Sequence, residues 1–223
     1  MASRTLIIVV GGDYLAFEIC SEILKTAGHG VVLVWKACDA REEAFLERES
    51  DDLRGRYGDG FVRIDADPLD RASLNRAGLH ASGDSLGPQC ALVAVSADDR
   101  LNLRVALLAR DIDDRVRITL RQFKPVLGQK IQAGLKFNCT VISPAAHAAA
   151  TYAAAAVEPS CFYALRFPTL ESNAGGLAEE YDLFAFSQRN AGDLGVDGMT
   201  VTQAESQLRA RIVTVDGIAP YVC

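Results

Sequence analysis

The sequence has no long apolar run, no paired cysteine motif and no excess of positive charge. The longest apolar run near its start, residues 6–10, is far shorter than the roughly 20 residues that a membrane-spanning helix needs. The six cysteines form neither a C-x-x-C pair nor a Cys/His spacing typical of zinc sites. Lysine and arginine number 23 against 29 aspartate and glutamate, whereas nucleic-acid binders need a basic surface. These absences predict a cytoplasmic protein with reduced thiols and no nucleic-acid partner.

The sequence also lacks a recognisable catalytic set. Short-chain dehydrogenases use a Tyr-x-x-x-Lys pair for proton transfer, and no tyrosine here has a lysine four residues later. His29 and His80 are predicted to lie in turns, and His147 on an alanine-rich helix, which favours structural or solvated histidines. We therefore expect no enzyme activity, with an NAD(P)-dependent oxidoreductase as the alternative.

What the sequence does contain is a regular alternation of apolar strands and amphipathic helices. With 223 residues, 49% of them hydrophobic, the chain can bury a full core. Expected strands cover residues 5–10, 31–35, 61–65, 90–95, 116–121 and 139–142. Expected helices cover residues 14–27, 40–50, 69–77, 99–110 and 125–133. Such alternation predicts an α/β fold, a Rossmann-type doubly wound parallel sheet, over residues 1–143.

The alternation ends after residue 143. Ser143 and Pro144 are typical of a helix start, and an alanine-rich helix is predicted over residues 144–158 as a crossover and dimerisation helix. Residues 159–223 are predicted to form a small α+β C-terminal lobe, which is a truncated subdomain if the chain is a fragment. Its expected elements are strands at 161–167, 182–187 and 211–216 and a helix at 202–208.

Ligands of open parallel sheets bind at the carboxyl ends of the strands, so the residues after each strand are the candidate site. The first expected strand is followed by Gly11, Gly12, Asp13, Tyr14 and Leu15. This resembles the dinucleotide fingerprint G-x-G-x-x-G/A, but Asp13 replaces the glycine that lets the backbone approach a pyrophosphate. A purely structural turn is the competing interpretation.

The remaining candidates follow the later strands. After the second strand, Trp35 and Lys36 stand where NAD-binding proteins carry an acid. An indole can stack on a base and a lysine can meet a phosphate, which favours adenosine phosphates or NADP over NAD. The other candidates after strands are Asp65, Ala66, Ser96 and Arg121. Arg121 could contact a phosphate or pair with a neighbouring carboxylate.

Several stretches resemble one known family in order and spacing. They include TLIIVVGGDYLAFEIC at the start, DADPLDRASLNRAG over residues 65–78, SADDRLNL over residues 96–103, and CTVISPAAHAAATYAAAA before the lobe. Together they resemble the RCK/KTN domain, also called TrkA-N, over about residues 4–157. The stretches at 65–78 and 96–103 are the most specific, because ordinary dehydrogenases do not share them.

The resemblance implies a cytosolic regulatory domain of a potassium channel or transport system, located at the inner face of the cell membrane beside its pore. It implies a homodimer, or a larger ring, that binds NAD(H) or ATP/ADP in the Rossmann cleft. Residues 11–14 would form the phosphate loop, Trp35 and Lys36 the ribose edge, and Asp65 and Ala66 the adenine edge. Ser96 would lie above the phosphates and Arg121 would contact them.

A cation-sensing domain with a non-functional nucleotide cleft is a further alternative. Hard cations need several oxygen ligands. Two acidic groups could supply them: Asp65, Asp67 and Asp70, and Glu179, Glu180 and Asp182. Such acids more often cap helices or face solvent, so no metal ligand is assigned.

Overall fold

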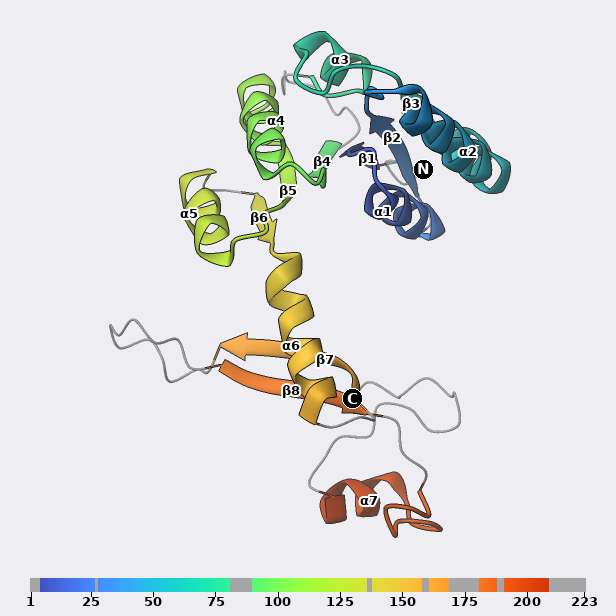
Figure 1. The fold of residues 1–223 in the computed structure, drawn as a ribbon, viewed down its shortest axis with the longest axis vertical. Helices are drawn as coiled ribbons and strands as arrows, with labels where there is room; N and C mark the ends of the chain where they lie inside the picture. Colours follow the sequence, from blue (N-terminus) through green and yellow to red (C-terminus); the bar gives the residue numbers. More distant parts are fainter. Residues whose placement is uncertain are drawn as a thin grey trace. The chain divides into compact units, whose positions relative to one another are not determined.

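The computed structural model describes residues 5–26, 28–80, 90–135, 138–157, 161–168, 181–187 and 191–208. The chain divides into two compact units, Met1–Ala146 and His147–Cys223 (Figure 1). Among these described ranges, no helix is long and apolar enough to cross a membrane.

The first unit is built on a six-stranded parallel sheet. Its strands are β1 (Thr5–Val10), β2 (His29–Val34), β3 (Phe61–Ile64), β4 (Cys90–Ala94), β5 (Arg117–Arg121) and β6 (Cys139–Ile142). The strand order is β3-β2-β1-β4-β5-β6, and β1 pairs in parallel with both β2 and β4. The order reverses between β1 and β4, as in a doubly wound sheet. The predicted Rossmann-type fold is therefore confirmed.

Helices cover both faces of this sheet (Figure 1). They are α1 (Tyr14–Lys25), α2 (Ala40–Tyr57), α3 (Arg71–Arg76), α4 (Asp99–Ile112) and α5 (Pro125–Leu135), with a 3-10 turn at Gly58–Gly60. One core joins buried residues of α1 and α2 to the sheet, among them Phe17, Leu46 and Leu53. A second core joins α3, α4 and α5 to the opposite face, through Leu74, Val105 and Ile131 among others.

The helix predicted over residues 40–50 is wrong in length. The structure continues α2 to Tyr57. Leu53 lies on the same face of the helix as the buried Leu46 and keeps the helix packed against the sheet. The helix ends at Gly58, whose φ of 56° is a conformation that favours glycine. The other predicted elements lying in the described residues match the structure to within a few residues.

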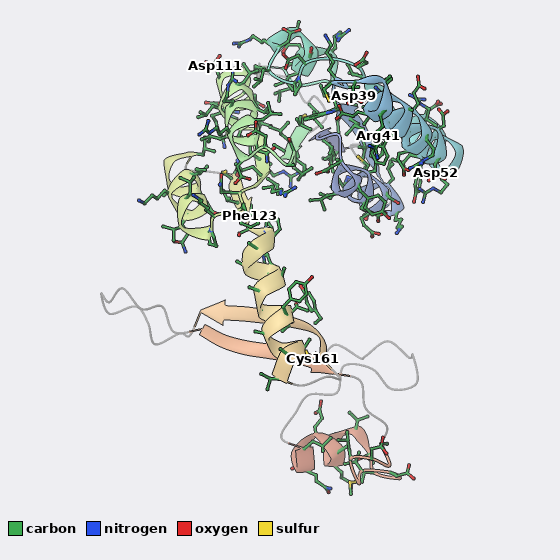
Figure 2. The ribbon with its side chains drawn as sticks, viewed as in Figure 1. Asp39, Arg41, Asp52, Asp111, Phe123 and Cys161 are labelled. Atoms are coloured by element: carbon green, nitrogen blue, oxygen red, sulfur yellow. The ribbon has the colours of Figure 1, made fainter. Side chains whose placement is uncertain are left out.

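The second unit contains the rest of α6 (Pro144–Val157), followed by β7 (Cys161–Pro168), β8 (Tyr181–Ser187) and α7 (Val201–Leu208). The two strands pair antiparallel. Ala150 and Ala154 of α6 pack against Cys161 and Ala164 of β7, and Figure 2 labels Cys161 beside the helix. The predicted strand at 211–216 lies outside the described residues.

Ser143 and Pro144 begin α6 as predicted. The Ser143 hydroxyl oxygen accepts a hydrogen bond from the backbone N–H of Ala146 at 3.3 Å. The same hydroxyl donates to the Phe123 carbonyl at 2.8 Å. The helix start is therefore attached to the segment that follows β5, where Figure 2 labels Phe123.

Candidate functional site

The candidate site lies where the strand order reverses, at the carboxyl ends of β1 and β4. Gly11 begins the loop after β1, and a Cβ atom there would lie 3.0 Å from Ala16 Cβ and 3.4 Å from Ser96 N. A Cβ atom this close to its neighbours would be tightly packed, and glycine avoids that crowding. The loops after β1 and β4 thus lie against each other, with β5 next to β4 in the sheet.

Four helices that leave this edge of the sheet begin in the same way. A backbone N–H in the first turn of each donates to an aspartate carboxylate that precedes the helix. These aspartates are Asp13, Asp39, Asp70 and Asp98. Capping satisfies backbone donors, and the negative charge complements the helix dipole. The anion-binding ends of α1 to α4 therefore already hold carboxylates of the chain.

Asp13 also joins two loops of the site. Its Oδ1 accepts from the backbone N–H of Ala16 at 3.1 Å. Its Oδ2 lies 3.6 Å from Nη1 of Arg121, the last residue of β5, and the two side chains are 37% and 22% exposed. Arg121 Nε is buried and makes no hydrogen bond within the described part of the chain. An arginine with a spare buried donor thus lies beside a carboxylate at the start of α1.

Trp35 covers the glycine next to Asp13. A Cβ atom on Gly12 would lie 2.1 Å from Trp35 Nε1, so the indole packs directly on the glycine backbone. The indole N–H donates to Glu42 Oε1 at 2.9 Å. In Rossmann domains the group after the second strand meets the ribose of a dinucleotide. In this structure an indole held by Glu42 fills the space beside Gly12.

Glu42 has a lowered pKa because donors surround its carboxylate. The backbone N–H of Cys38 donates to Oε2 at 2.6 Å and makes the largest contribution, followed by the Cys38 side chain, while the Trp35 indole adds a smaller one. Hydrogen bonds to the charged form of a carboxyl favour that form. Glu42 therefore stays ionised and keeps Trp35 in place.

Asp99 and Asn102 position the loops after β4 and β5. Asn102 is fully buried, and its Nδ2 donates to the carbonyls of Ser96 at 2.8 Å and Arg121 at 3.2 Å. Asp99 Oδ2 accepts from Gln122 Nε2 at 2.7 Å and from Phe123 N at 2.9 Å. These contacts attach the backbone around Arg121 to the start of α4.

Asp99, Asn102 and Glu42 are not among the site residues predicted from the sequence. Asn102 could have been found, because it shares the helical spacing of the buried Val105, Ala106 and Ala109, where a polar residue needs partners. Glu42 could also have been found, because it lies three residues after the Asp39 cap, as in a capping box.

Four other predicted site residues make no side-chain hydrogen bond or ion pair with Asp13 or Arg121 within the described ranges: Tyr14, Leu15, Lys36 and Asp65. Tyr14 and Leu15 lie in the first turn of α1, 64% and 38% exposed. The hydrogen bond with Glu18 raises the pKa of Tyr14. Lys36 and Asp65 are exposed, and neither makes an ion pair or hydrogen bond within the described ranges.

Two further predicted residues are buried at the strand ends. Ala66 is 8% exposed and follows β3. Ser96 is 4% exposed, and its Oγ accepts from the backbone N–H of Asp98 at 3.1 Å. The Ser96 hydroxyl thus shapes the loop after β4.

Two of the acids considered for cation binding, Asp67 and Asp70, have local partners. Asp67 Oδ1 accepts from Leu69 N, and Asp70 caps α3. Glu179 and Glu180, and the side chain of Asp182, lie outside what the structure describes. In the part of the chain that it describes, no group of three or more His, Cys, Asp or Glu side chains could hold a metal.

The residues present fit a phosphate better than a whole dinucleotide. Arg121, with its spare Nε–H, is a suitable partner for an anion. Against this, Asp13 brings a negative charge to the start of α1, and Trp35 fills the space on Gly12. A bound phosphate would therefore share Arg121 with Asp13.

No protein-family model and no curated protein matches the chain. Among solved structures, the GsuK RCK domain is 16% identical, with 78% of this chain and 32% of that chain covered and a TM-score of 0.49. A GsuK channel bound to NAD is 16% identical, with 74% of this chain and 26% of that chain covered and a TM-score of 0.49. The TrkA-N domain of the inner membrane protein ybaL from Escherichia coli is 14% identical, with 69% of this chain and 97% of that chain covered and a TM-score of 0.47.

This chain thus spans about a third of the GsuK RCK structure and about a quarter of the NAD-bound channel. The strand order and parallel pairing within this chain define its Rossmann-type fold.

Proposed function

We propose that this chain is a non-catalytic regulatory domain that senses a nucleotide in its Rossmann cleft and controls a potassium channel or transport system. The observation that carries the sensing role is Arg121 at the switch point, beside the Gly11–Gly12 loop and the start of α1. The link to a potassium pore rests on the sequence resemblance to RCK/KTN domains. On this proposal the domain assembles as a homodimer or larger ring at the inner face of the membrane.

The ligand we favour is an adenine nucleotide such as ADP or ATP. Its phosphates would meet Arg121 and the backbone N–H groups of the loop after β1, because helix starts and arginines both bind phosphate. The adenosine part would lie towards Trp35, whose indole offers a stacking surface. NAD(H) would need more of the space that Trp35 fills on Gly12.

A role without catalysis agrees with the residues at this edge of the sheet. The polar and aromatic side chains that lie there include two contacting pairs, Asp13 with Arg121 and Trp35 with Glu42, and also Ser96. Asp13 and Glu42 are engaged as a helix cap and as an indole partner. His29 begins β2 at the opposite edge. Ligand binding would therefore act by changing the loops after β1, β4 and β5.

Calorimetric titration with ADP, ATP, NADH and NADPH tests the sensing role. We expect adenine nucleotides to bind, and Arg121→Ala to weaken binding about tenfold or more, because a charged hydrogen bond contributes about 1.5–3 kcal/mol. Arg71→Ala is the matched control, since it removes the same charge from an exposed pair with Asp111 at the far end of α4 (Figure 2). Absence of binding at millimolar nucleotide, or unchanged affinity in Arg121→Ala, would contradict the proposal.

A further inference from the structure

We infer that Asp13 is a built-in competitor of the ligand's phosphate, so that the cleft binds nucleotide only when Arg121 leaves Asp13. This inference rests on the proposed nucleotide-sensing function and says how that site is regulated. Its basis is the position of the Asp13 carboxylate, which both caps α1 and pairs with Arg121.

The Asp13 carboxylate already makes the contacts that a phosphate would make. Its Oδ1 accepts a hydrogen bond from the Ala16 N–H in the first turn of α1, and its Oδ2 lies 3.6 Å from Nη1 of Arg121. These two kinds of donor, a helix start and an arginine, are the ones that bind phosphates in α/β proteins. Asp13 therefore acts as an internal anion in the phosphate position.

The ion pair between Asp13 and Arg121 can separate at little energetic cost. Both side chains are partly exposed and the charged atoms are 3.6 Å apart, and ion pairs of this kind contribute little to stability. Arg121 does not depend on Asp13 for its position, because Asn102 holds its backbone carbonyl. Asp13 keeps its place through the α1 cap. The arginine can thus turn to a phosphate while both loops stay in place.

Once a phosphate binds Arg121, the Asp13 charge remains beside it and repels it. Two like charges about 4 Å apart near a protein surface repel strongly enough to change affinity by tenfold or more. Removing the Asp13 charge while keeping the cap should therefore tighten phosphate binding. Asparagine does this, since it caps helices as well as aspartate.

The test measures ADP binding to the full chain and to Asp13→Asn, by calorimetry and by the emission of Trp35, which is the single tryptophan. We expect Asp13→Asn to bind ADP about tenfold or more tightly. Adenosine, which has no phosphate, should bind both proteins equally. The difference for ADP should shrink as salt is added, because salt screens partly exposed charges.

Asp70→Asn is the matched control, because Asp70 caps α3 in the same way and its carboxylate accepts hydrogen bonds from Ala72 N and Ser73 Oγ. If Asp70→Asn tightened ADP binding as much, net charge and not position would be responsible, and the inference would be overturned. Equal ADP affinity in the wild type and Asp13→Asn would overturn the competition and leave nucleotide sensing intact. If no protein bound ADP, both the inference and the proposed function would fail.

Discussion

Trp35 is the residue whose setting most changes the interpretation of the cleft. Its indole lies on the Gly12 backbone and is held by Glu42 from the start of α2. A side chain at Gly12 would overlap the indole, so the loop after β1 and the residue after β2 depend on each other. The space directly on the Gly12 backbone is thus occupied by the chain's own aromatic ring.

The lowered pKa of Glu42 predicts how this arrangement responds to acid. Because the folded state favours its charged form, Glu42 stabilises the fold above the ordinary pKa of a glutamate. That contribution is lost as the pH falls through the lower pKa of the folded state. We expect the emission of Trp35 to change over that acidic range and Glu42→Gln to show the altered emission already at neutral pH.

Glu43→Gln is the control for this titration. Glu43 is the next residue of α2, but its carboxylate pairs with Arg63 and not with the indole. An identical acid response of Trp35 emission in the wild type and Glu42→Gln would contradict the assignment.

At the scale of elements, α4 organises the site although it supplies no predicted ligand contact. Its first two turns hold the loop after β4 through Ser96 and the segment after β5 through Arg121 and Gln122. The stretch SADDRLNL, which resembles RCK/KTN domains, thus has a structural role. It fixes the backbone from which Arg121 extends.

Asn102→Ala should destabilise the first unit and weaken nucleotide binding together. The substitution leaves two backbone carbonyls without this donor in a buried place, at a cost of about 1–3 kcal/mol. Urea denaturation should show a lower midpoint, and ADP titration a weaker affinity. Asn75→Ala, a change of the same residue type on α3, should leave the ADP affinity unchanged. Wild-type affinity in Asn102→Ala would show that α4 does not position Arg121.

At the scale of the whole molecule, the two units have separate cores. The first unit buries α1 and α2 on one face of its sheet and α3, α4 and α5 on the other. The second unit packs small side chains of α6 against β7, and Thr151 Oγ1 both accepts from Ala164 N and donates to its carbonyl. Ala150 and Ala154, on the alanine-rich helix predicted to serve dimerisation, therefore pack against β7 of the same chain. Dimerisation itself stays a prediction.

Separate cores predict that the first unit folds without the second. A chain of residues 1–143 should unfold in one cooperative transition, because all residues of its two cores lie within that range. Its unfolding free energy should fall less steeply with urea concentration than that of the full chain, because it exposes less surface on unfolding. A broad, non-cooperative transition followed by circular dichroism would contradict this expectation.

Much of the fold follows from local patterns that the chain carries along its length. Runs of β-branched residues such as residues 5–10, separated by helices that begin at aspartates, fit a doubly wound parallel sheet almost regardless of distant contacts. The positions of Gly11, Asp13, Ser96 and Arg121 at strand ends follow from the same patterns. The length of α2 did not follow from local patterns. Residues near Leu53 in the sequence are mostly polar, but burial of Leu53 against the sheet extends the helix.

The tertiary structure alone decided how these positions combine. Asp13 and Arg121 are far apart in the chain, and only the β1-β4-β5 order brings their charges together. The contact of Trp35 with Gly12 requires β2 beside β1 in a given register. Sequence periodicity reports which face a residue occupies, but not which distant side chain it meets there. The strand-end positions of these residues were therefore predictable, whereas the Asp13–Arg121 pair and the Trp35–Gly12 contact became visible only in three dimensions.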